Sequence, residues 1–187
     1  MKKNSTHEIR LAGSGGQGVI LASVIIAEAA ILAGRYTAQS ESYGPEARGG
    51  SCRAETLISD RPIGFTKVQN PTFLMAFTQK ALDQYSQGVS KDCQVLIDST
   101  LTVPSTILPS QVIALPILST ARDVVGKVQT ASVLTVGAIN ELLGIADKET
   151  LKQAVMMHIP SGTEKLNLKA LEEGIKLALD WKKEHGI

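Results

Sequence analysis

The sequence feature that most constrains the fold is a glycine-rich segment, GSGGQG at residues 13–18, which separates a short apolar segment from a long one. Residues 8–12 (EIRLA) have the composition of a strand. Residues 19–33 are mostly Ala, Ile and Leu, and Gly34 is placed to end a helix there. A strand, a glycine turn and a helix predict the opening of an α/β domain, with residues 36–42 as the second strand of a βαβ unit.

The rest of the chain continues this alternation of strands and helices. The other predicted strands are residues 51–59, 72–77, 94–98 and 111–115, with a hairpin partner for the first of these at 63–68. The other predicted helices are residues 79–87, 130–143, 148–157 and 164–183. This order predicts a three-layer α/β/α fold with a Rossmann-like opening and a parallel or mixed sheet, formed by residues 1–187 as a single domain.

Composition excludes several classes of function. The net charge is +1, from 19 basic and 18 acidic residues, which lacks the basic excess typical of a nucleic-acid-binding protein. The two cysteines, Cys52 and Cys93, are too few for the four thiolates of an iron–sulfur cluster and predict no disulfide framework, so a reducing cytoplasm is the expected compartment. The apolar run at 19–33 contains Glu28 and is shorter than the roughly 20 residues of a membrane span, so we predict a soluble protein.

The GSGGQG segment is a candidate anion site, because loop N–H groups and the positive end of the following helix can receive a phosphate or carboxylate. The residues of this candidate site are Gly13, Ser14, Gly15, Gly16, Gln17 and Gly18. Other functions are compatible with the pattern. A dinucleotide site would place Glu41 on a ribose, an adenylating enzyme would need further catalytic residues, and glycines that only permit tight packing would bind nothing.

A second glycine-rich segment, SYGPEARGG at residues 42–50, carries both an acidic and a basic residue. Arg48 offers a planar fork for a carboxylate or phosphate, and Tyr43 is a residue type enriched at protein interfaces. We predict that this segment contacts a partner chain or a ligand, although Glu46 and Arg48 paired within the loop would explain the charges without a partner. The candidate contact residues are Tyr43, Gly44, Pro45, Glu46, Arg48, Gly49 and Gly50.

Three segments together, GSGGQGVILAS, SYGPEARGGSCRAE and PSGTEKLNLKAL, resemble the gamma subunit of the 2-oxoacid:ferredoxin oxidoreductases over nearly the whole chain. The sequence YGPEA at residues 43–47 is similar to that of the subunits whose complexes act on 2-oxoglutarate, pyruvate and ketoisovalerate, and less similar to that of the indolepyruvate branch. Within that branch the chain looks most similar to the 2-oxoglutarate type. Thr72 and Ser132 depart from the residues common in relatives, so the resemblance gives them no role.

The resemblance implies the reaction of a complex, in which a 2-oxoacid is oxidatively decarboxylated to an acyl-CoA while ferredoxin is reduced. Thiamine diphosphate, magnesium and iron–sulfur clusters would then lie on alpha and beta subunits, with a ferredoxin-like delta subunit in some relatives and coenzyme A as co-substrate. This chain would bind no cofactor firmly and hold no catalytic residue. Its role would be to assemble the complex, with a contribution near the coenzyme A site. Arg48 would contact a partner or coenzyme A, and the isolated chain would be inactive and able to homodimerise.

Two functions of other classes remain open at the level of sequence. A free-standing, Rossmann-like dinucleotide-binding oxidoreductase would use residues 13–18 with Glu41, and a small-ligand-binding module would need no partner. The three histidines lie far apart in the sequence, which favours surface or helix-end positions over catalysis. Ser99 follows Asp98 at a strand end, where an Asp-Ser pair favours a turn cap over a pocket-lining residue, and Gly137 is predicted to pack in the core.

Overall fold

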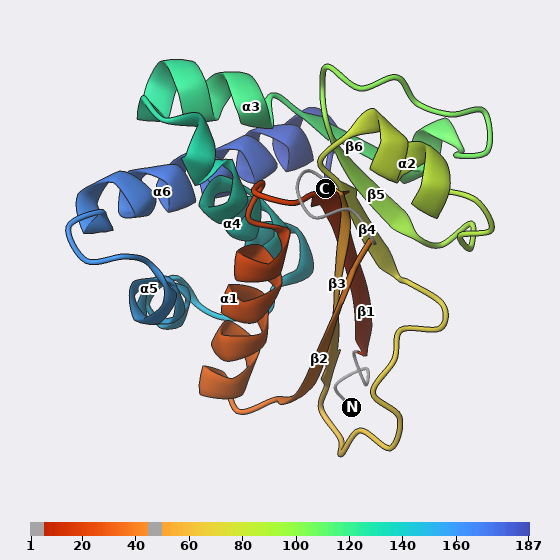
Figure 1. Ribbon diagram of the computed structural model, residues 1–187, viewed down its shortest axis with the longest axis horizontal. Coiled ribbons are helices and arrows are strands. Elements are labelled where there is room, and N and C mark those ends of the chain that lie inside the picture. The colour runs from red at the N-terminus through yellow and green to blue at the C-terminus, as the bar shows by residue number, and fades with distance from the viewer. Residues whose placement is uncertain (1–5, 45–49) are drawn as a thin grey trace.

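The computed structural model describes residues 6–44 and 50–187, and its centre is a six-stranded mixed sheet in the order β2-β3-β1-β4-β5-β6 (Figure 1). The strands are β1 His7–Ser14, β2 Tyr36–Tyr43, β3 Ser51–Ser59, β4 Phe73–Ala76, β5 Gln94–Asp98 and β6 Val112–Leu115. The α-helices are α1 Val19–Leu32, α2 Gln79–Tyr85, α3 Ile117–Ser119, α4 Ala131–Leu143, α5 Lys148–His158 and α6 Glu164–Glu184. Short helical turns are η1 Pro109–Gln111, η2 Thr120–Val125 and η3 Val128–Thr130.

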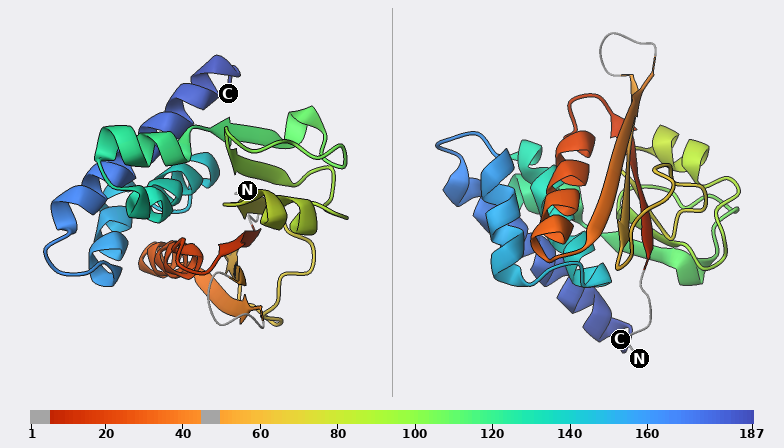
Figure 2. Two further views of the ribbon diagram at one scale, coloured as in Figure 1. Left: turned by 45° about the horizontal axis from the view of Figure 1, so that its top comes forward. Right: turned by 90° about the horizontal axis from the view of Figure 1, so that it is seen from below.

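Helices cover the two faces of the sheet unequally. Helices α1, α4, α5 and α6 lie on one face and α2 lies on the other (Figures 1 and 2). The larger hydrophobic cluster joins Ile9 and Leu11 of β1 to the first group, and a smaller cluster joins Ala12 and Leu74 to Leu82 of α2. The predicted three-layer α/β/α fold with a mixed sheet is therefore confirmed.

The position of β3 corrects the predicted βαβ unit. Strand β3 runs antiparallel to both of its neighbours, β1 and β2, so β1 and β2 are parallel but do not touch. The predicted strand at 63–68 is wrong, because both edges of β3 are already paired and no third strand can join it. Residues 60–72 instead cross the sheet as a loop, held where the Glu8 carboxylate accepts the N–H groups of Gln69 and Asn70 at 2.9 and 3.1 Å.

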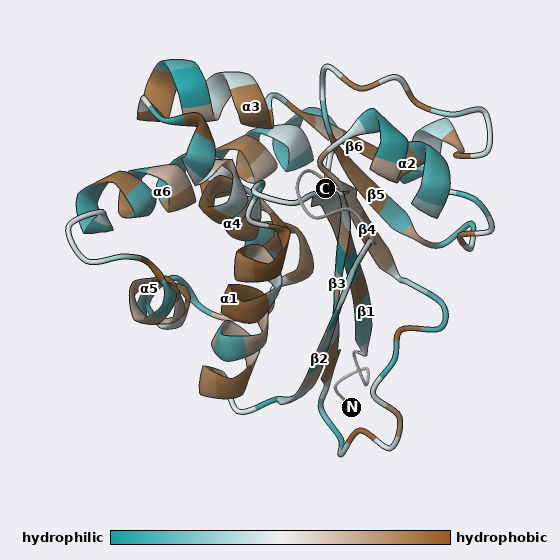
Figure 3. Ribbon diagram, in the orientation of Figure 1, coloured by the Kyte–Doolittle hydropathy of each residue, from teal (hydrophilic) through white to brown (hydrophobic). Residues whose placement is uncertain are grey.

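Helix α1 is largely apolar around its circumference, because other elements pack against it on several sides (Figure 3). It packs on β3 and β2 and also on α4 and α5, and Ser23 shares a 2.8 Å hydrogen bond with Thr56 of β3. Gly34, with φ of 79°, follows the helix, as predicted. Among the helices in the described parts of the chain, none is both long and apolar enough to span a bilayer.

One helical segment was not predicted. After β6, α3 and η2 form a helical run through residues 117–125 that ends at Gly126, whose φ is 99°. Its buried residues Ile117, Ala121 and Val125 recur every four positions, which is a helical spacing that a search of the sequence could have found. The run starts directly after Pro116 and is short, so its apolar periodicity extends over too few residues to indicate a helix from the sequence.

Helices α4 and α6 approach so closely that each contributes a glycine to the contact. A Cβ on Gly174 would lie 1.8 Å from the carbonyl oxygen of Leu134, and a Cβ on Gly137 would lie 2.3 Å from that of Leu171. The obstructing atoms are backbone atoms, which cannot move without moving a helix. Gly137 is therefore a core residue, as predicted.

We expect Gly174→Ala to destabilise the fold strongly, although alanine normally favours a helix over glycine. The expected loss in free energy of unfolding is about 3 kcal/mol, because the two helices must separate to admit one methyl group. Chemical denaturation followed by circular dichroism measures this loss. Gly64→Ala is the matched control, since no atom lies within 4 Å of its added Cβ, and it should change stability by less than about 0.5 kcal/mol. Equal stability of the two variants would contradict the close contact.

Candidate functional site

The GSGGQG segment lies at the point where the chain changes from one face of the sheet to the other. Parallel neighbours β1 and β4 are followed by α1 and α2, and these helices lie on opposite faces (Figure 1). In open α/β sheets, ligands bind outside the carboxyl ends of the strands at such a switch point. The two carboxyl ends are in contact here, because a Cβ on Gly13 would lie 3.0 Å from the Cβ of Phe77.

The loop at residues 13–18 is closed by its own hydrogen bonds. The side-chain oxygen of Gln17 accepts the N–H of Ser14 at 2.7 Å, and the N–H of Gln17 donates to the carbonyl of Ser14 at 3.2 Å. The N–H of Gly15 donates to the carbonyl of Gly50 at 3.0 Å. Three backbone donors of the predicted anion site are thus engaged within the protein, so an anion there would depend on the remaining donors of the loop.

Gly18 shows why glycine is needed at the start of α1. Its φ of 75° lies in the left-handed region, and a Cβ there would be 2.6 Å from the Cβ of Ser132. The N–H of Ala22 donates to the Gly18 carbonyl at 2.9 Å, which begins the helix. Close packing against α4 therefore accounts for this glycine, in agreement with the packing alternative.

The second glycine-rich segment joins β2 to β3 and lies beside the first. Its described residues are Tyr43, which pairs with Cys52, and Gly44, whose N–H donates to the carbonyl of Ser51 at 2.7 Å. Pro45, Glu46, Ala47, Arg48 and Gly49 lie outside the described residues. The ends of β2 and β3 extend past the helical layer (Figure 2), and Tyr43 is 65% exposed. The Gly15–Gly50 hydrogen bond brings the two predicted segments together.

Glu41 does not occupy the position of a ribose-binding acid. In a dinucleotide-binding unit that residue ends the strand adjacent to the first strand. Here the adjacent strand is β3, and Glu41 lies one strand further out, on the exposed edge strand β2, opposite Ala54. The carboxylate instead lies near Cys52, and burial first, then the Glu41 charge, raises the pKa of that thiol.

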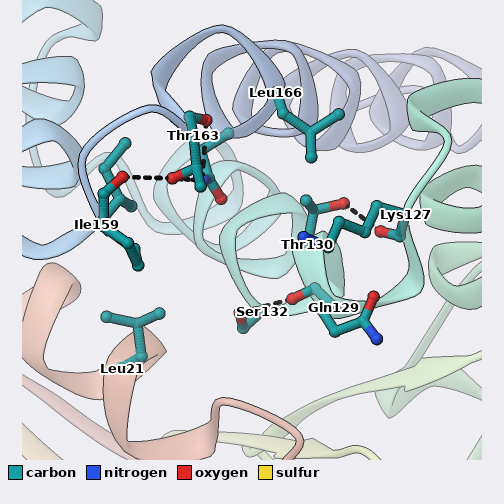
Figure 4. A pocket seen from close by; sticks show the side chains of 10 residues that line it. Leu21, Lys127, Gln129, Thr130, Ser132, Ile159, Thr163 and Leu166 are labelled. Atoms are coloured by element: carbon teal, nitrogen blue, oxygen red, sulfur yellow. Dashed lines mark hydrogen bonds between the residues drawn. The ribbon is translucent and has the colours of Figure 1, made fainter.

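The third segment, PSGT at 160–163, forms one wall of a pocket of about 210 Å³ (Figure 4). Leu21 of α1, Ser132 of α4 and Leu166 of α6 line it together, so it lies where the first turns of three helices meet. Its threonine hydroxyls donate to nearby carbonyls, Thr130 to Lys127 at 2.7 Å and Thr163 to Pro160 at 2.6 Å. This pocket was not predictable from the sequence, because its walls come from segments more than 100 residues apart.

The two thiols and His7 have pKa values that their surroundings shift. Cys93 is 1% exposed, and burial raises the pKa of its thiol to about 11. Burial and the Arg35 charge lower the pKa of His7. Within residues 6–44 and 50–187, no three His, Cys, Asp or Glu side chains are grouped so as to hold a metal ion.

The other two histidines and Asp98 have structural contacts. His158 lies at the end of α5 with its Nε2 atom 3.6 Å from the Glu28 carboxylate, and the His185 ring stacks on Trp181 with centroids 4.2 Å apart. Asp98 is 2% exposed and accepts the N–H groups of Thr100 and Leu118 at 3.0 and 2.7 Å. The turn cap predicted at Asp98-Ser99 is present, and Asp98 is the residue that caps it.

Comparison with known proteins gives consistent matches over almost the whole chain. The family model described as pyruvate ferredoxin/flavodoxin oxidoreductase matches residues 8–177. The 2-oxoglutarate synthase subunit KorC of Methanocaldococcus jannaschii is 38% identical, covering 91% of this chain and 93% of its own. The crystal structure of a keto/oxoacid ferredoxin oxidoreductase gamma subunit from Geobacter sulfurreducens has a TM-score of 0.80 and 40% identity, covering 93% of this chain and 99% of that one.

A larger protein contains the same fold. The structure of 2-oxoglutarate:ferredoxin oxidoreductase from Magnetococcus marinus, with 2-oxoglutarate, coenzyme A and succinyl-CoA bound, has a TM-score of 0.83. The match covers 96% of this chain but 32% of that one, at 23% identity. At this identity the likeness establishes the fold alone.

We expect Gly18→Ala to lower the free energy of unfolding by about 2–3 kcal/mol, from left-handed backbone strain plus the clash with Ser132. A double-mutant cycle with Ser132→Gly, followed by chemical denaturation, separates the two causes. In the Ser132→Gly background, Gly18→Ala should cost only the strain, about 1–2 kcal/mol. A cost that is the same in both backgrounds would contradict the close approach of α1 to α4.

Both thiols should resist alkylation in the folded protein, because the thiolate is the reactive form and both pKa values are raised. We expect iodoacetamide to leave Cys52 and Cys93 unmodified at about pH 8 and to modify both once guanidinium chloride unfolds the chain. A raised pKa keeps a thiol protonated to higher pH, so Cys93 should begin to react only as the pH approaches about 11. Mass spectrometry of tryptic peptides measures each site. Rapid native alkylation of either cysteine near neutral pH would contradict this prediction.

Proposed function

This chain belongs to the pyruvate ferredoxin/flavodoxin oxidoreductase family, and from that premise we propose that it is the gamma subunit of a 2-oxoglutarate:ferredoxin oxidoreductase complex. The complex would oxidatively decarboxylate 2-oxoglutarate, transfer the acyl group to coenzyme A and reduce ferredoxin. One observation carries the proposal: the chain aligns over nearly its full length with a separate gamma subunit and with a 2-oxoglutarate synthase subunit of similar length.

The contribution of this chain is structural rather than chemical. Its two cysteines cannot supply the four thiolates of a cluster, and both thiols are buried and protonated at neutral pH. Thiamine diphosphate, magnesium and the clusters would therefore be held by alpha, beta and, where present, delta chains. The isolated chain would be inactive, and its compartment would be the cytoplasm.

The docking surface of this chain would be the end of the β2–β3 hairpin. Tyr43 is exposed there, Gly44 and Gly50 border the undescribed residues, and the loop at 13–18 supports Gly50 through Gly15. An exposed tyrosine is a residue type enriched at interfaces. We extend the proposal to Arg48, as a contact to a partner carboxylate or to a phosphate of coenzyme A, beside the coenzyme A site of the complex.

Co-expression of this chain with alpha and beta chains from the same genome tests the function. Reduction of ferredoxin in the presence of coenzyme A should be fastest with 2-oxoglutarate, by about tenfold or more in kcat/KM over pyruvate and 2-oxoisovalerate. Omission of this chain should abolish assembly or turnover. Preference for pyruvate would overturn the substrate assignment, and full activity without this chain would overturn the subunit assignment.

Arg48→Ala should impair the complex without unfolding the chain. We expect either loss of co-purification or a rise in the KM for coenzyme A of about tenfold, as for loss of one charged hydrogen bond. The control is Arg122→Ala, because Arg122 is exposed and paired with its neighbour Asp123 at 2.8 Å. Size-exclusion chromatography and steady-state kinetics measure the two effects. An Arg48→Ala complex indistinguishable from the control would remove Arg48 from the interface.

A further inference from the structure

Strand β2 is the last strand at one end of the sheet, and within the described residues no strand pairs with its outer side (Figure 2). It pairs with β3 over eight consecutive residues without a bulge, from Tyr36 with Ser59 to Tyr43 with Cys52. None of these eight residues is buried, and their sequence, YTAQSESY, contains neither Lys nor Pro. Natural edge strands are usually short, bulged, covered or charged, because an open edge pairs readily with another chain. Strand β2 has one charged residue, Glu41, and is otherwise open to a further strand.

The opposite edge of the sheet is protected in the usual way. Strand β6 has four residues, the η1 turn directly precedes it, and Pro116 directly follows it. A short strand bounded in this way offers a second chain little backbone to pair with. The length and exposure of β2 therefore need a separate explanation, and its backbone favours pairing with another strand.

The register with β3 identifies the backbone groups of β2 that face outward. Gly44 continues this register opposite Ser51, and its N–H donates to the Ser51 carbonyl at 2.7 Å. In an antiparallel ladder, residues bonded to the partner strand alternate with residues whose N–H and C=O point away from it. The backbone groups of residues 37, 39, 41 and 43 therefore point away from β3. No hydrogen bond joins these groups to any other described part of the chain.

We propose that β2 pairs with β2 of a second copy of this chain, antiparallel and across a two-fold axis that passes through Ser40 perpendicular to the sheet. This axis places Gln39 opposite Glu41 of the second copy, and all the outward N–H and C=O groups then have partners. The Gln39 amide can donate to that carboxylate, so the one charge of the strand faces a donor. Tyr43 faces the β-branched Thr37 of the second copy, which is a favourable cross-strand pair. An axis through Gln39 would instead leave Tyr43 beyond the paired strands.

The proposed dimer goes beyond the gamma-subunit function and does not rest on it. The axis lies at the middle of β2, whereas the hairpin end that we assign to partner chains begins at Tyr43, which borders both surfaces. Because the two strands are antiparallel, the hairpin ends of the two copies lie at opposite ends of the strand pair and do not meet. The net charge of +1 on each copy gives little long-range repulsion between them.

Sedimentation equilibrium of the purified, full-length chain tests the dimer. It should give a mass of twice 19.9 kDa, with a dissociation constant of about 10 µM or below. Gln39→Pro should give a monomer with an unchanged circular dichroism spectrum, because it removes an outward N–H while the ladder to β3 stays intact. The matched control is Lys148→Pro, at the first residue of α5, where proline is tolerated. This variant should remain dimeric.

An introduced cysteine tests the position of the axis. Ser40 would lie opposite Ser40 of the second copy in a non-hydrogen-bonded pair, with Cα atoms about 4.5 Å apart, a separation that a disulfide can bridge. Oxidation with copper phenanthroline should therefore link the two copies of Ser40→Cys, as seen by non-reducing electrophoresis. Ser42→Cys, on the same face of β2, is the control, because its thiols would be about 13 Å apart along the strands. The native Cys52 and Cys93 are both buried.

Several outcomes would overturn the proposal. These are a chain that stays monomeric at about 100 µM, tenfold above the expected dissociation constant, and a dimer that Gln39→Pro leaves intact or Lys148→Pro also disrupts. Equal cross-linking of Ser40→Cys and Ser42→Cys would contradict the axis. If Gln39→Pro does not fold, Gln39→Glu decides, because it places a second carboxylate opposite Glu41 and should weaken the dimer several-fold. The gamma-subunit function is tested separately, by ferredoxin reduction, and survives each of these outcomes.

Discussion

The antiparallel ladder between β1 and β3 is the interaction on which the rest of this structure depends. It pairs residues from His7 with Ile58 through Ser14 with Ser51 and so places β3 between two strands that are consecutive in an ordinary βαβ unit. The ladder sets Arg10 opposite Glu55 and brings Gly13 opposite Cys52. Because one face of this ladder is covered by α1, a shift in register by one residue would turn its buried side chains to the wrong face.

Two local arrangements follow from that ladder. Strand β3 begins beside the GSGGQG loop, so the carbonyl of Gly50 accepts the N–H of Gly15 and the hairpin end is held against this loop. On the α2 side, Arg10 and Arg53 lie beside the buried Glu55 carboxylate. The hairpin end is the surface that we assign to docking onto partner chains.

The glycines and thiols of this chain act through packing rather than through chemistry. Because Gly18 has no side chain, Ser132 of α4 can lie against the start of α1. Because Gly174 has none, the backbone of α4 at Leu134 can lie against α6. Cys52 and Cys93 are buried with raised pKa values, which keeps both thiols protonated. A chain built in this way is consistent with a subunit that positions other chains while they perform the reaction.

The sequence by itself determined the strands, most of the helices, the layered class of the fold and the family, because these depend on local periodicity and on short contiguous segments. The turn cap at Asp98-Ser99 was also predictable, because the Asp98 carboxylate accepts the N–H of Thr100, two residues on. Gly137 was predictable as a core residue from the apolar residues around it, although the helix against which it packs lies elsewhere in the sequence. Only the tertiary structure decided the insertion of β3, the edge position of Glu41, the absence of a strand at 63–68 and the joining of Arg10 to Glu55. Strand order depends on pairing between residues about 45 apart, and competing orders bury the same apolar residues, so local pattern cannot choose among them.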